Sequence, residues 1–458
     1  MNNQEGPPTP PAAGSPGATT PSGPSTALLT DQYELTMLDA ALRSGMADHP
    51  AVFEVFTRRL PAGRLYGVVA GVGRLLDAFS RFEFGDEELE WLERQAIVGP
   101  VALDWLRDQR FSGHVDAYRE GELYTANSPV VTVEATFGEA VLLETLVLSI
   151  LNHDSAVAAA AALIVSAAGQ RPVIEMGSRR TDPGAAVAAA RAAYLAGFAS
   201  TSNLEAGRRY GIPTAGTAAH AFTLAYGNER KAFAAQVASL GAETTLLVDT
   251  YDTEEGIRDA VAVAGPGLGA VRIDSGDLVS EAWRARRLLD ELGATGTRVV
   301  VTGDLDHHTL RELADAPADS YGVGTNVVTG LGSPTAGFVY KLVAVGDTPG
   351  GELRPVAKRS PGKSTVGGRK WAWRVHEPRP PDGFDGPSPR YDRPVWADLI
   401  AGDPEPPSHA ERALQQRVVD QGRIVGRVDL AEARRFHHTV HAELPAGEPL
   451  ISYRRPLR

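Results

Sequence analysis

The chain has 458 residues, more than one hydrophobic core usually supports, so its length favours two or three domains. Its formal net charge of -12 argues against broad binding to nucleic acid or to a membrane surface, because such binding depends on clustered positive charge. Cysteine is absent, which excludes disulfides, thiolate nucleophiles and cysteine metal sites. No leader-like segment opens the chain and no stretch approaches the ~18 apolar residues of a membrane span, so we expect a cytoplasmic protein.

Residues 1–26 consist mainly of Pro, Gly, Ser, Thr and Ala and have almost nothing to bury. We therefore predict a disordered tail there. Ordered structure is expected from Ala27, because the segment LLTDQYELTM at 28–37 carries a helix-capping signature at Thr30 or Asp31 and then a helical apolar pattern.

The next segment, residues 27–136, alternates like a strand at 51–56 and contains several strand-like runs within 113–134. These runs predict a smaller α+β domain beside the main one. The most apolar tract, 140–168, is interrupted by polar residues and predicts a pair of buried helices.

Residues 137–345 repeat one arrangement, in which a short apolar run ends in polar residues and a helical segment such as 185–196 or 309–316 follows. The spacing is that of β/α units, whose strands build an active site at their carboxyl ends. Chance helix capping explains one such ending better than the whole series. The endings are VIEMGSRR at 173–180, ASTSN at 199–203, TAGTAAH at 214–220, LLVDTYD at 246–252, VRIDSGD at 271–277, VVVTGD at 299–304 and YGVGTN at 321–326.

The segment at 271–277 is the most informative, because it places a guanidinium, two carboxylates and a hydroxyl where a strand runs out into a loop. Residues 268–273 predict the strand, and 278–292 predict an amphipathic helix. Carboxylates at such a strand end can bind sugar hydroxyls. Taken alone, the segment is explained better by Asp274 and Ser275 capping the helix.

The C-terminal part, 346–458, is expected to contain a basic loop, a Pro-rich linker and closing helices. The strand-like run before it, FVYKLVAV at 338–345, is expected to continue the barrel series. Within the C-terminal part we place the basic loop at 355–370, the linker at 377–394, a helical segment at 408–441 and a last strand at 450–453.

In their order along the chain, these motifs resemble those of the nicotinate phosphoribosyltransferases, from LLTDQY at 28–33 to Arg374. The resemblance implies an irregular (β/α) barrel that carries the active site, with a second, smaller α+β domain built mainly from the N-terminal segment. It implies transfer of the phosphoribosyl group of phosphoribosyl pyrophosphate to nicotinate in NAD biosynthesis, by a homodimer with active sites at the subunit interface. It also implies Mg²⁺ and coupled ATP hydrolysis through a phosphohistidine, whose motif position is His220.

The resemblance also assigns the ribose and phosphates to residues of these motifs. Displacing pyrophosphate from the anomeric carbon passes through an oxocarbenium-like state, which a carboxylate stabilises while cations neutralise the leaving group. Asp274 is expected to bind the ribose, with Arg272 beside it and Asp277 close to Mg²⁺ or the phosphohistidine. Glycine turns present backbone amides to a 5′-phosphate, and the expected residues are Gly303, Asp304, Gly322, Gly324 and Thr325.

A planar anionic pyridine calls for an aromatic face and a guanidinium. By motif position, Tyr33 supplies the first, and Arg179 or Arg180 supplies the second. Met176 stands where the related nicotinamide enzymes have an aromatic residue, so a two-ring sandwich is not expected. Ser202 stands where those enzymes have an aspartate and should favour an acid over an amide, although it fits the cap of the next helix equally well.

His220, Lys363 and Arg369 also have plainer explanations. A histidine after a Gly-Thr turn is commonly a helix-start or core residue, although Asp249 and Asp252 on the next strand end would orient it for chemistry. Charge runs are usually solvated surface, yet Lys363 and Arg369 match the family pattern and are expected to face polyphosphate, including that of a neighbouring subunit.

Four alternatives stay open at this stage. One is a phosphosugar isomerase or aldolase barrel, which the glycine loops alone would allow, although no lysine ends an early strand where a Schiff base would need one. The other three are as follows. Quinolinate phosphoribosyltransferase shares the architecture but needs several cations for two carboxylates and no ATP, and Ser202 and the Gly-Thr-x-x-His motif argue against it. The second is a nicotinamide phosphoribosyltransferase. The third is a catalytically silent barrel that acts as a binding protein, against which the intact Asp274, Asp277 and His220 weigh.

Overall fold

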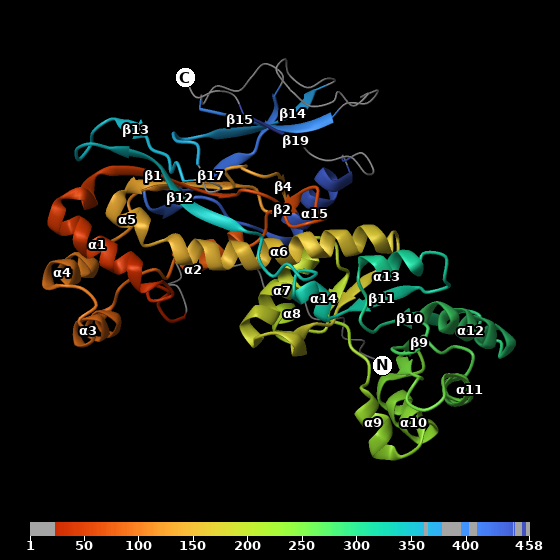
Figure 1. The fold of residues 1–458 in the computed structure, drawn as a ribbon. Helices are drawn as coiled ribbons and strands as arrows, with labels where there is room; N and C mark the ends of the chain where they lie inside the picture. The colour runs from red at the N-terminus through yellow and green to blue at the C-terminus, as the bar shows by residue number, and fades with distance from the viewer. Residues whose placement is uncertain are drawn as a thin grey trace, which may run out of the picture.

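The computed structural model describes residues 23–360, 365–377, 395–402, 410–442, 444 and 451–454. Two large sheets lie next to each other, and one long helix, α6 (Glu144–Ala168), runs from the first to the second (Figure 1). The first sheet is antiparallel and starts from the N-terminal segment. The second is parallel and comes from the middle of the chain.

The antiparallel sheet has seven strands in the order β13-β12-β1-β5-β3-β17-β18. Its apolar face packs on α2 and the first half of α6, with the rings of Phe53 and Tyr340 stacked at 4.8 Å between centroids. The strands are β1 (Pro50–Thr57), β3 (His114–Tyr118), β5 (Val131–Thr136), β12 (Phe338–Gly346), β13 (Leu353–Pro355), β17 (Gln415–Asp420) and β18 (Arg423–Ile424).

Further elements surround this sheet. The first third of the chain also forms the small pair of strands β2 (Gly67–Val68) and β4 (Leu123–Tyr124) and a set of helices, α1 (Gln32–Ser44), η1 (Met46–Asp48), α2 (Val72–Phe79), α3 (Asp86–Arg94), α4 (Pro100–Asp108) and α5 (Phe137–Val141). A four-stranded sheet is formed by β14 (Trp371–Glu377), β15 (Val395–Ala401), β16 (Ala410–Ala413) and β19 (Ile451–Arg454). The C-terminal helix is α15 (Leu430–Ala442).

The parallel sheet has six strands in the order β7-β6-β11-β10-β9-β8 and curls into an incomplete barrel, which confirms the predicted irregular barrel with a separate N-terminal domain (Figure 1). Its strands are β6 (Val173–Glu175), β7 (Ser200–Thr201), β8 (Thr245–Leu247), β9 (Ala270–Ile273), β10 (Arg298–Val301) and β11 (Ser320–Val323). The helical segments between and after them are η2 (Ser178–Arg180), α7 (Pro183–Leu195), α8 (Leu204–Tyr210), α9 (His220–Tyr226), α10 (Glu229–Leu240), α11 (Thr253–Ala264), α12 (Leu278–Glu291), α13 (His307–Glu312) and α14 (Thr325–Val328).

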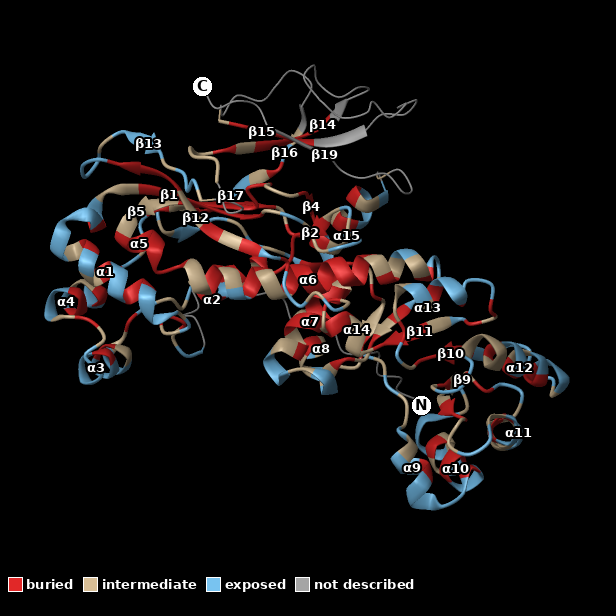
Figure 2. Ribbon diagram, in the orientation of Figure 1, coloured by how far each residue is buried: buried red, intermediate tan, exposed pale blue. Residues whose placement is uncertain are grey.

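Helix α6 contributes to both hydrophobic cores. Its first half places Leu146 and Ile150 under the antiparallel sheet, and its second half packs small side chains such as Ala158 against the equally Ala-rich α7. Figure 2 shows both helices buried at the centre of the molecule, while α9 and α12 expose one face. By length and composition α6 could cross a membrane, but 67% of its most apolar window is buried inside the protein, as in a core helix.

The predicted pair of helices over 140–168 is wrong, because α6 runs unbroken through its polar residues. Asn152 accepts hydrogen bonds from the backbone of Phe338 at 2.8 Å and the hydroxyl of Thr335 at 2.7 Å. Asp154 is paired with Arg74 at 2.7 Å. Residues from other elements therefore provide hydrogen-bond and ion-pair partners for the polar side chains of α6, which in the sequence had suggested the end of a helix.

Two strand assignments also differ from expectation. The prediction that 338–345 continues the barrel is wrong, because β12 pairs antiparallel with β1 in the other sheet. The predicted helical segment at 408–441 is wrong in its first part, where β16, β17 and β18 precede α15. Both errors have one cause, since strand pairing between distant segments leaves little trace in a local pattern.

A buried ion pair joins the two domains. Arg191 on α7 contacts both carboxylate oxygens of Glu120, in the loop between β3 and β4, at 2.5 and 2.9 Å. The side chains are 3% and 0% exposed. Glu120 also accepts the backbone N–H of Gly71 at 2.6 Å, just before α2.

Replacing Arg191 by methionine should lower the free energy of unfolding by about 3 kcal/mol, because it leaves the Glu120 carboxylate buried without a counter-charge. Chemical denaturation of the two proteins measures this loss. The matched control is Arg94→Met, which breaks an exposed pair with Glu90 and should change stability by less than about 1 kcal/mol. Equal losses in the two variants would show that the interdomain pair contributes little.

Candidate active site

A cavity of about 200 Å³ opens at the carboxyl ends of β6, β9, β10 and β11. Because these strands are parallel, the polar endings that follow them meet at one edge of the sheet. The structure thus brings together most of the residues expected at the site. The lining consists of Met176, Arg179, Arg180, Arg272, Asp274, Thr302, Gly303, Asp304, Gly322, Gly324 and Thr325.

Arg272 and Asp274 are held in one hydrogen-bonded group with Thr302. The guanidinium of Arg272 donates to Asp274 at 2.8 Å, to the hydroxyl of Thr302 at 2.8 Å and to that of Thr217 at 3.1 Å. The Thr302 hydroxyl in turn contacts the same oxygen of Asp274. Burial opposes ionisation of Asp274, but the hydrogen bonds from Thr302 and Arg272 outweigh it and lower the pKa of this carboxyl below its ordinary value.

His220 and Asp274 share a single carboxylate, that of Asp249. One oxygen of Asp249 lies 3.1 Å from Nε2 of His220, and the other accepts the backbone N–H of Asp274 at 2.8 Å and the hydroxyl of Ser275 at 2.7 Å. The side chain of Asp249 is 2% exposed, whereas that of His220 is 40% exposed. The histidine at the start of α9 is therefore oriented by a buried acid and open to solvent.

Glycines let the strand ends of β9, β10 and β11 and the loop after β6 pack closely against one another. Gly303 has a φ of 125°, a conformation that other residues rarely adopt. A Cβ on Gly322 would lie 2.6 Å from the Thr302 methyl and 2.7 Å from Sδ of Met176. The wall of the cavity therefore has no room for a larger residue at this position.

Gly322→Ala should raise about tenfold the KM for a substrate bound in this cavity, because Thr302 or Met176 must move to admit the methyl group. Steady-state kinetics and a thermal melt measure the two consequences. Gly296→Ala is the matched control, since a Cβ there meets nothing within 4 Å. A variant with unchanged KM would show that this wall tolerates displacement.

Arg179 and Arg180 are exposed at the mouth of the cavity, in the short helix η2. Within the described ranges, neither guanidinium has a carboxylate partner. Unpaired arginines beside a cavity are suited to a ligand carboxylate or phosphate.

Some predicted site residues lie elsewhere in the chain. Tyr33 is on α1, 44% exposed, and burial together with Glu144 raises its pKa to about 12. Ser202 is half-buried after β7 and does not line the cavity; the cap of α8 is Asn203, so the capping alternative for Ser202 is wrong. Asp277 caps α12, and its carboxylate accepts the Ser280 hydroxyl at 2.9 Å.

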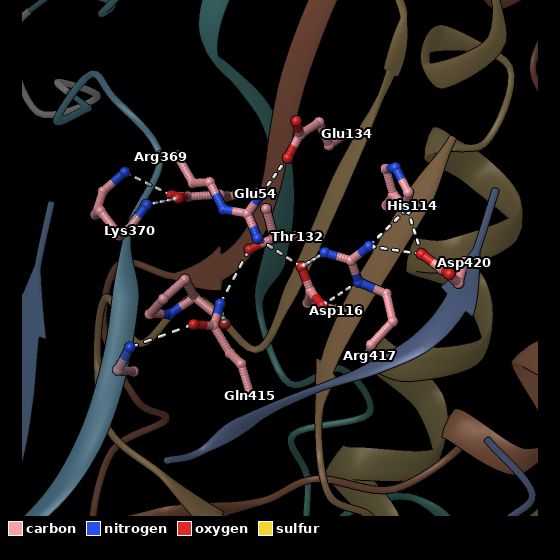
Figure 3. A network of polar contacts seen from close by, with 12 residues as sticks. Glu54, His114, Asp116, Thr132, Glu134, Arg369, Lys370, Gln415, Arg417 and Asp420 are labelled. Carbon is pink, nitrogen blue, oxygen red and sulfur yellow. Dashed lines mark hydrogen bonds and ion pairs between the residues drawn. The ribbon is translucent and has the colours of Figure 1, made fainter. Parts of the chain in front are cut away.

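Lys363 lies outside the described residues, and Arg369 is part of a charged network on the antiparallel sheet (Figure 3). Arg369 donates to Asp116 at 2.6 Å and also contacts Glu134. Next to it, Lys370 contacts the fully buried Glu54 at 2.5 Å. In its own chain, Arg369 therefore neutralises carboxylates of the sheet and does not reach the cavity.

The sequence reasoning missed Thr302 and Glu175. Both lie inside quoted motifs, VVVTGD and VIEMGSRR, but neither has a side chain that by itself signals chemistry. Thr302 connects Arg272 to Asp274, and Glu175 is a buried carboxylate behind the cavity wall.

The cavity suits a divalent ion only if substrate phosphates supply some of its ligands. Within the described part of the chain, no group of three or more His, Asp or Glu side chains could hold a metal ion. Asp274 and Asp304 are nevertheless present in the lining. Mg²⁺ is commonly held by one or two carboxylates together with substrate phosphates, and these residues suit that mode.

Comparison with known families identifies the class. The model of the nicotinate phosphoribosyltransferase N-terminal domain matches residues 28–152, and that of the quinolinate phosphoribosyl transferase C-terminal domain matches residues 157–329. Fold, cavity and both models define a phosphoribosyltransferase with an incomplete barrel.

Individual relatives narrow the class further. Nicotinate phosphoribosyltransferase pncB1 of Mycobacterium tuberculosis is 51% identical over 97% of this chain and 98% of its own length, and that of Bacillus subtilis is 38% identical over 77% and 73%. The crystal structure of human nicotinic acid phosphoribosyltransferase superposes with a TM-score of 0.75 at 25% identity, covering 93% of this chain and 97% of the human one. The chain belongs to the nicotinate phosphoribosyltransferase family.

Proposed function

We propose that this protein transfers the phosphoribosyl group of phosphoribosyl pyrophosphate to nicotinate, forming nicotinate mononucleotide and pyrophosphate in NAD biosynthesis. The observation that carries the proposal is the group formed by Arg272, Asp274 and Thr302 at the floor of a cavity whose mouth holds Arg179 and Arg180. It is supported by the relatives named above, most of all by the one that matches nearly the whole chain.

The residues of the cavity suit the two halves of this reaction. The carboxylate of Asp274 is ionised and lies where ribose hydroxyls and the developing positive charge on the sugar would be stabilised. Gly303, Gly322 and Gly324 line the cavity, and backbone amides at such glycines would bind the 5′-phosphate. The bond from the anomeric carbon to the pyrophosphate oxygen breaks, and the bond to the pyridine nitrogen forms.

The arginines at the mouth would bind the carboxylate of nicotinate, because a guanidinium pairs with a carboxylate through two parallel hydrogen bonds. Ser202, after the neighbouring strand β7, presents no negative charge that would repel it. This favours nicotinate over nicotinamide. Quinolinate, with two carboxylates, would require more cations than these two arginines.

We further propose that ATP phosphorylates Nδ1 or Nε2 of His220 and that hydrolysis of the resulting phosphohistidine accompanies transfer. Asp249 supports this role, because a buried carboxylate at 3.1 Å from Nε2 orients the ring. Phosphorylation forms a nitrogen–phosphorus bond and releases ADP. Mg²⁺ would neutralise the phosphates of ATP and of phosphoribosyl pyrophosphate, held in part by Asp274 and Asp304, the two carboxylates in the lining. Asp277, three residues after Asp274, would lie close to the ion.

The active unit would be a homodimer in the cytoplasm. Among the residues that the structure describes, no aromatic side chain lines the cavity, whereas Tyr33 and Met37 are exposed on α1 and Leu29 is exposed just before it. Exposed apolar side chains also cluster on α9, where they include Phe222 and Leu224. A second copy of the chain would cover such patches and supply Tyr33 to the cavity.

A product assay tests the proposal. Phosphoribosyl pyrophosphate is supplied with nicotinate, nicotinamide or quinolinate, each with and without ATP, and pyrophosphate release is measured. Release that depends on nicotinate and is stimulated by ATP supports the whole proposal. The proposal is contradicted if pyrophosphate is released with quinolinate and not with nicotinate, or if none of the three bases leads to release.

A further inference from the structure

Glu175 is a buried carboxylate directly behind the cavity wall. It ends β6 and is 1% exposed. One oxygen accepts the backbone N–H of Gly177, and the other accepts the hydroxyl of Thr201, at the end of β7, at 2.5 Å. In the described ranges it has no cationic partner, so burial raises its pKa, while the hydrogen bonds from Thr201 and Gly177 act in the opposite direction.

A buried carboxylate without a counter-ion is costly, so it usually has a role beyond filling space. In the described part of the chain, no hydrogen bond or ion pair joins Glu175 to the lining residues that follow β9 or β10, so it is not a catalytic residue. Its two carboxylate oxygens instead hold the loop after β6, through Gly177, and the last residue of β7, Thr201, from which the next loop starts.

The same two loops are joined by further hydrogen bonds. The backbone N–H of Ser202 donates to the carbonyl of Glu175 at 2.8 Å. The hydroxyl of Thr201 accepts the backbone N–H of Asn203 at 3.0 Å, and the side-chain amide of Asn203 donates to the hydroxyl of Ser178 at 3.0 Å. The closed set of bonds fixes one loop against the other.

We propose that Glu175 and Thr201 are positioning residues that set the separation between Arg179 and Arg180 on one loop and Ser202 on the next, and so the affinity for the base. The inference rests on the proposed function, because a pyridine carboxylate is the group that would bind between these loops. Two parallel hydrogen bonds from a guanidinium demand defined geometry, and a displacement of about 1 Å can cost as much as about 100-fold.

The phosphate side of the cavity should be less sensitive to this pair. Its residues follow β9, β10 and β11, which keep their own pairing. The start of the β6 loop also stays attached to β11, because the backbone N–H of Met176 donates to the carbonyl of Val323 at 2.8 Å. Loss of the Glu175–Thr201 bond would therefore affect mainly the base.

The test compares Thr201→Val, which keeps the shape but removes the hydroxyl, with Thr201→Ser, which restores it. We expect Thr201→Val to raise the KM for nicotinate about tenfold and to leave the KM for phosphoribosyl pyrophosphate within about twofold. Thr201→Ser should return the KM for nicotinate to within about twofold of the unmodified protein. The matched control is Thr297→Val. Thr297 lies at the amino end of β10, away from the cavity, and its buried hydroxyl donates to the carbonyl of Leu268 at 2.8 Å.

Thr297→Val should lower the melting temperature as Thr201→Val does, without changing the KM for nicotinate. Equal rises in both KM values for Thr201→Val, or the same rise in the control, would overturn the proposal. If Thr201→Val does not fold, Glu175→Gln is tested in its place. An unchanged KM for nicotinate in Glu175→Gln would contradict the proposal. If neither variant folds, Glu175 and Thr201 have a structural role, and the positioning proposal is overturned as well. If the unmodified protein is inactive on nicotinate, the proposed function is refuted instead.

Discussion

Asp274→Asn is expected to lower kcat about 10³-fold while the protein stays folded. Asparagine keeps an acceptor for Arg272 and Thr302 but removes the negative charge beside the sugar. The charge matters mainly in the transition state, when the ribose becomes cationic, so kcat should fall more than substrate affinity. Steady-state kinetics with both substrates, together with a thermal melt, measure this effect.

The pH dependence follows from the lowered pKa of Asp274. Burial opposes ionisation, but the hydrogen bonds from Thr302 and Arg272 prevail, so the folded pKa lies below that of the unfolded chain. The stabilisation from the ionised carboxylate is therefore fully present above the unfolded pKa and is lost as the pH falls through the folded one. A decline in activity between neutral and mildly acidic pH should not come from this group.

Asp306→Asn is the control for this variant. Asp306 lies on the same edge of the sheet but caps α13, accepting the backbone N–H groups of His308 and Thr309 at 2.9 and 2.8 Å. Its replacement should leave kcat within about twofold, since asparagine also caps helices. A fall of less than about tenfold for Asp274→Asn, the size of one lost hydrogen bond, would contradict the electrostatic role.

His220→Ala is expected to abolish the stimulation by ATP and leave a slow transfer that ATP does not change. In the presence of ATP, the rate of pyrophosphate release should be about 100-fold lower than that of the unmodified protein, which is within the range of coupling between two ligands. Incorporation of the γ-phosphoryl group of ATP into the protein should disappear with it. Pyrophosphate release with and without ATP, and radiolabel from ATP, measure the two effects separately.

The matched control is His308→Ala, which removes an exposed histidine from the first turn of α13, as His220 stands in the first turn of α9. It should retain both ATP stimulation and labelling. Persistent labelling of His220→Ala would place the phosphoryl group on another residue. If His220→Ala fails to fold while His308→Ala folds, the role of His220 is structural.

Much of the barrel was predictable because its signals are local. The strand β9 and the helix α12 follow from a short apolar run and an amphipathic period on either side of VRIDSGD. The helix α7 and the strand β1 were likewise expected close to their observed bounds. Parallel strands align their carboxyl ends, so polar endings in series sufficed to predict that Arg272, Asp274 and Gly322 would meet.

The antiparallel sheet was predictable only in part. Alternation identified β12 as a strand but gave no sign that its partner is β1, some 290 residues earlier in the chain. The same limit applies to β17, which pairs with β3. Such pairings depend on side chains from both segments packing on a common face, which no single window of sequence records.

The amino-acid sequence by itself determined the kinds of residue at the strand ends and the order in which they occur, and from these the class of chemistry. Only the tertiary structure decided which of them act together. It showed Asp249 bonded to both His220 and Asp274, and it placed Arg369 among the carboxylates of the other sheet. The physical reason is that a polar side chain takes its role from the partners within hydrogen-bonding distance, and folding brings those partners from distant parts of the chain.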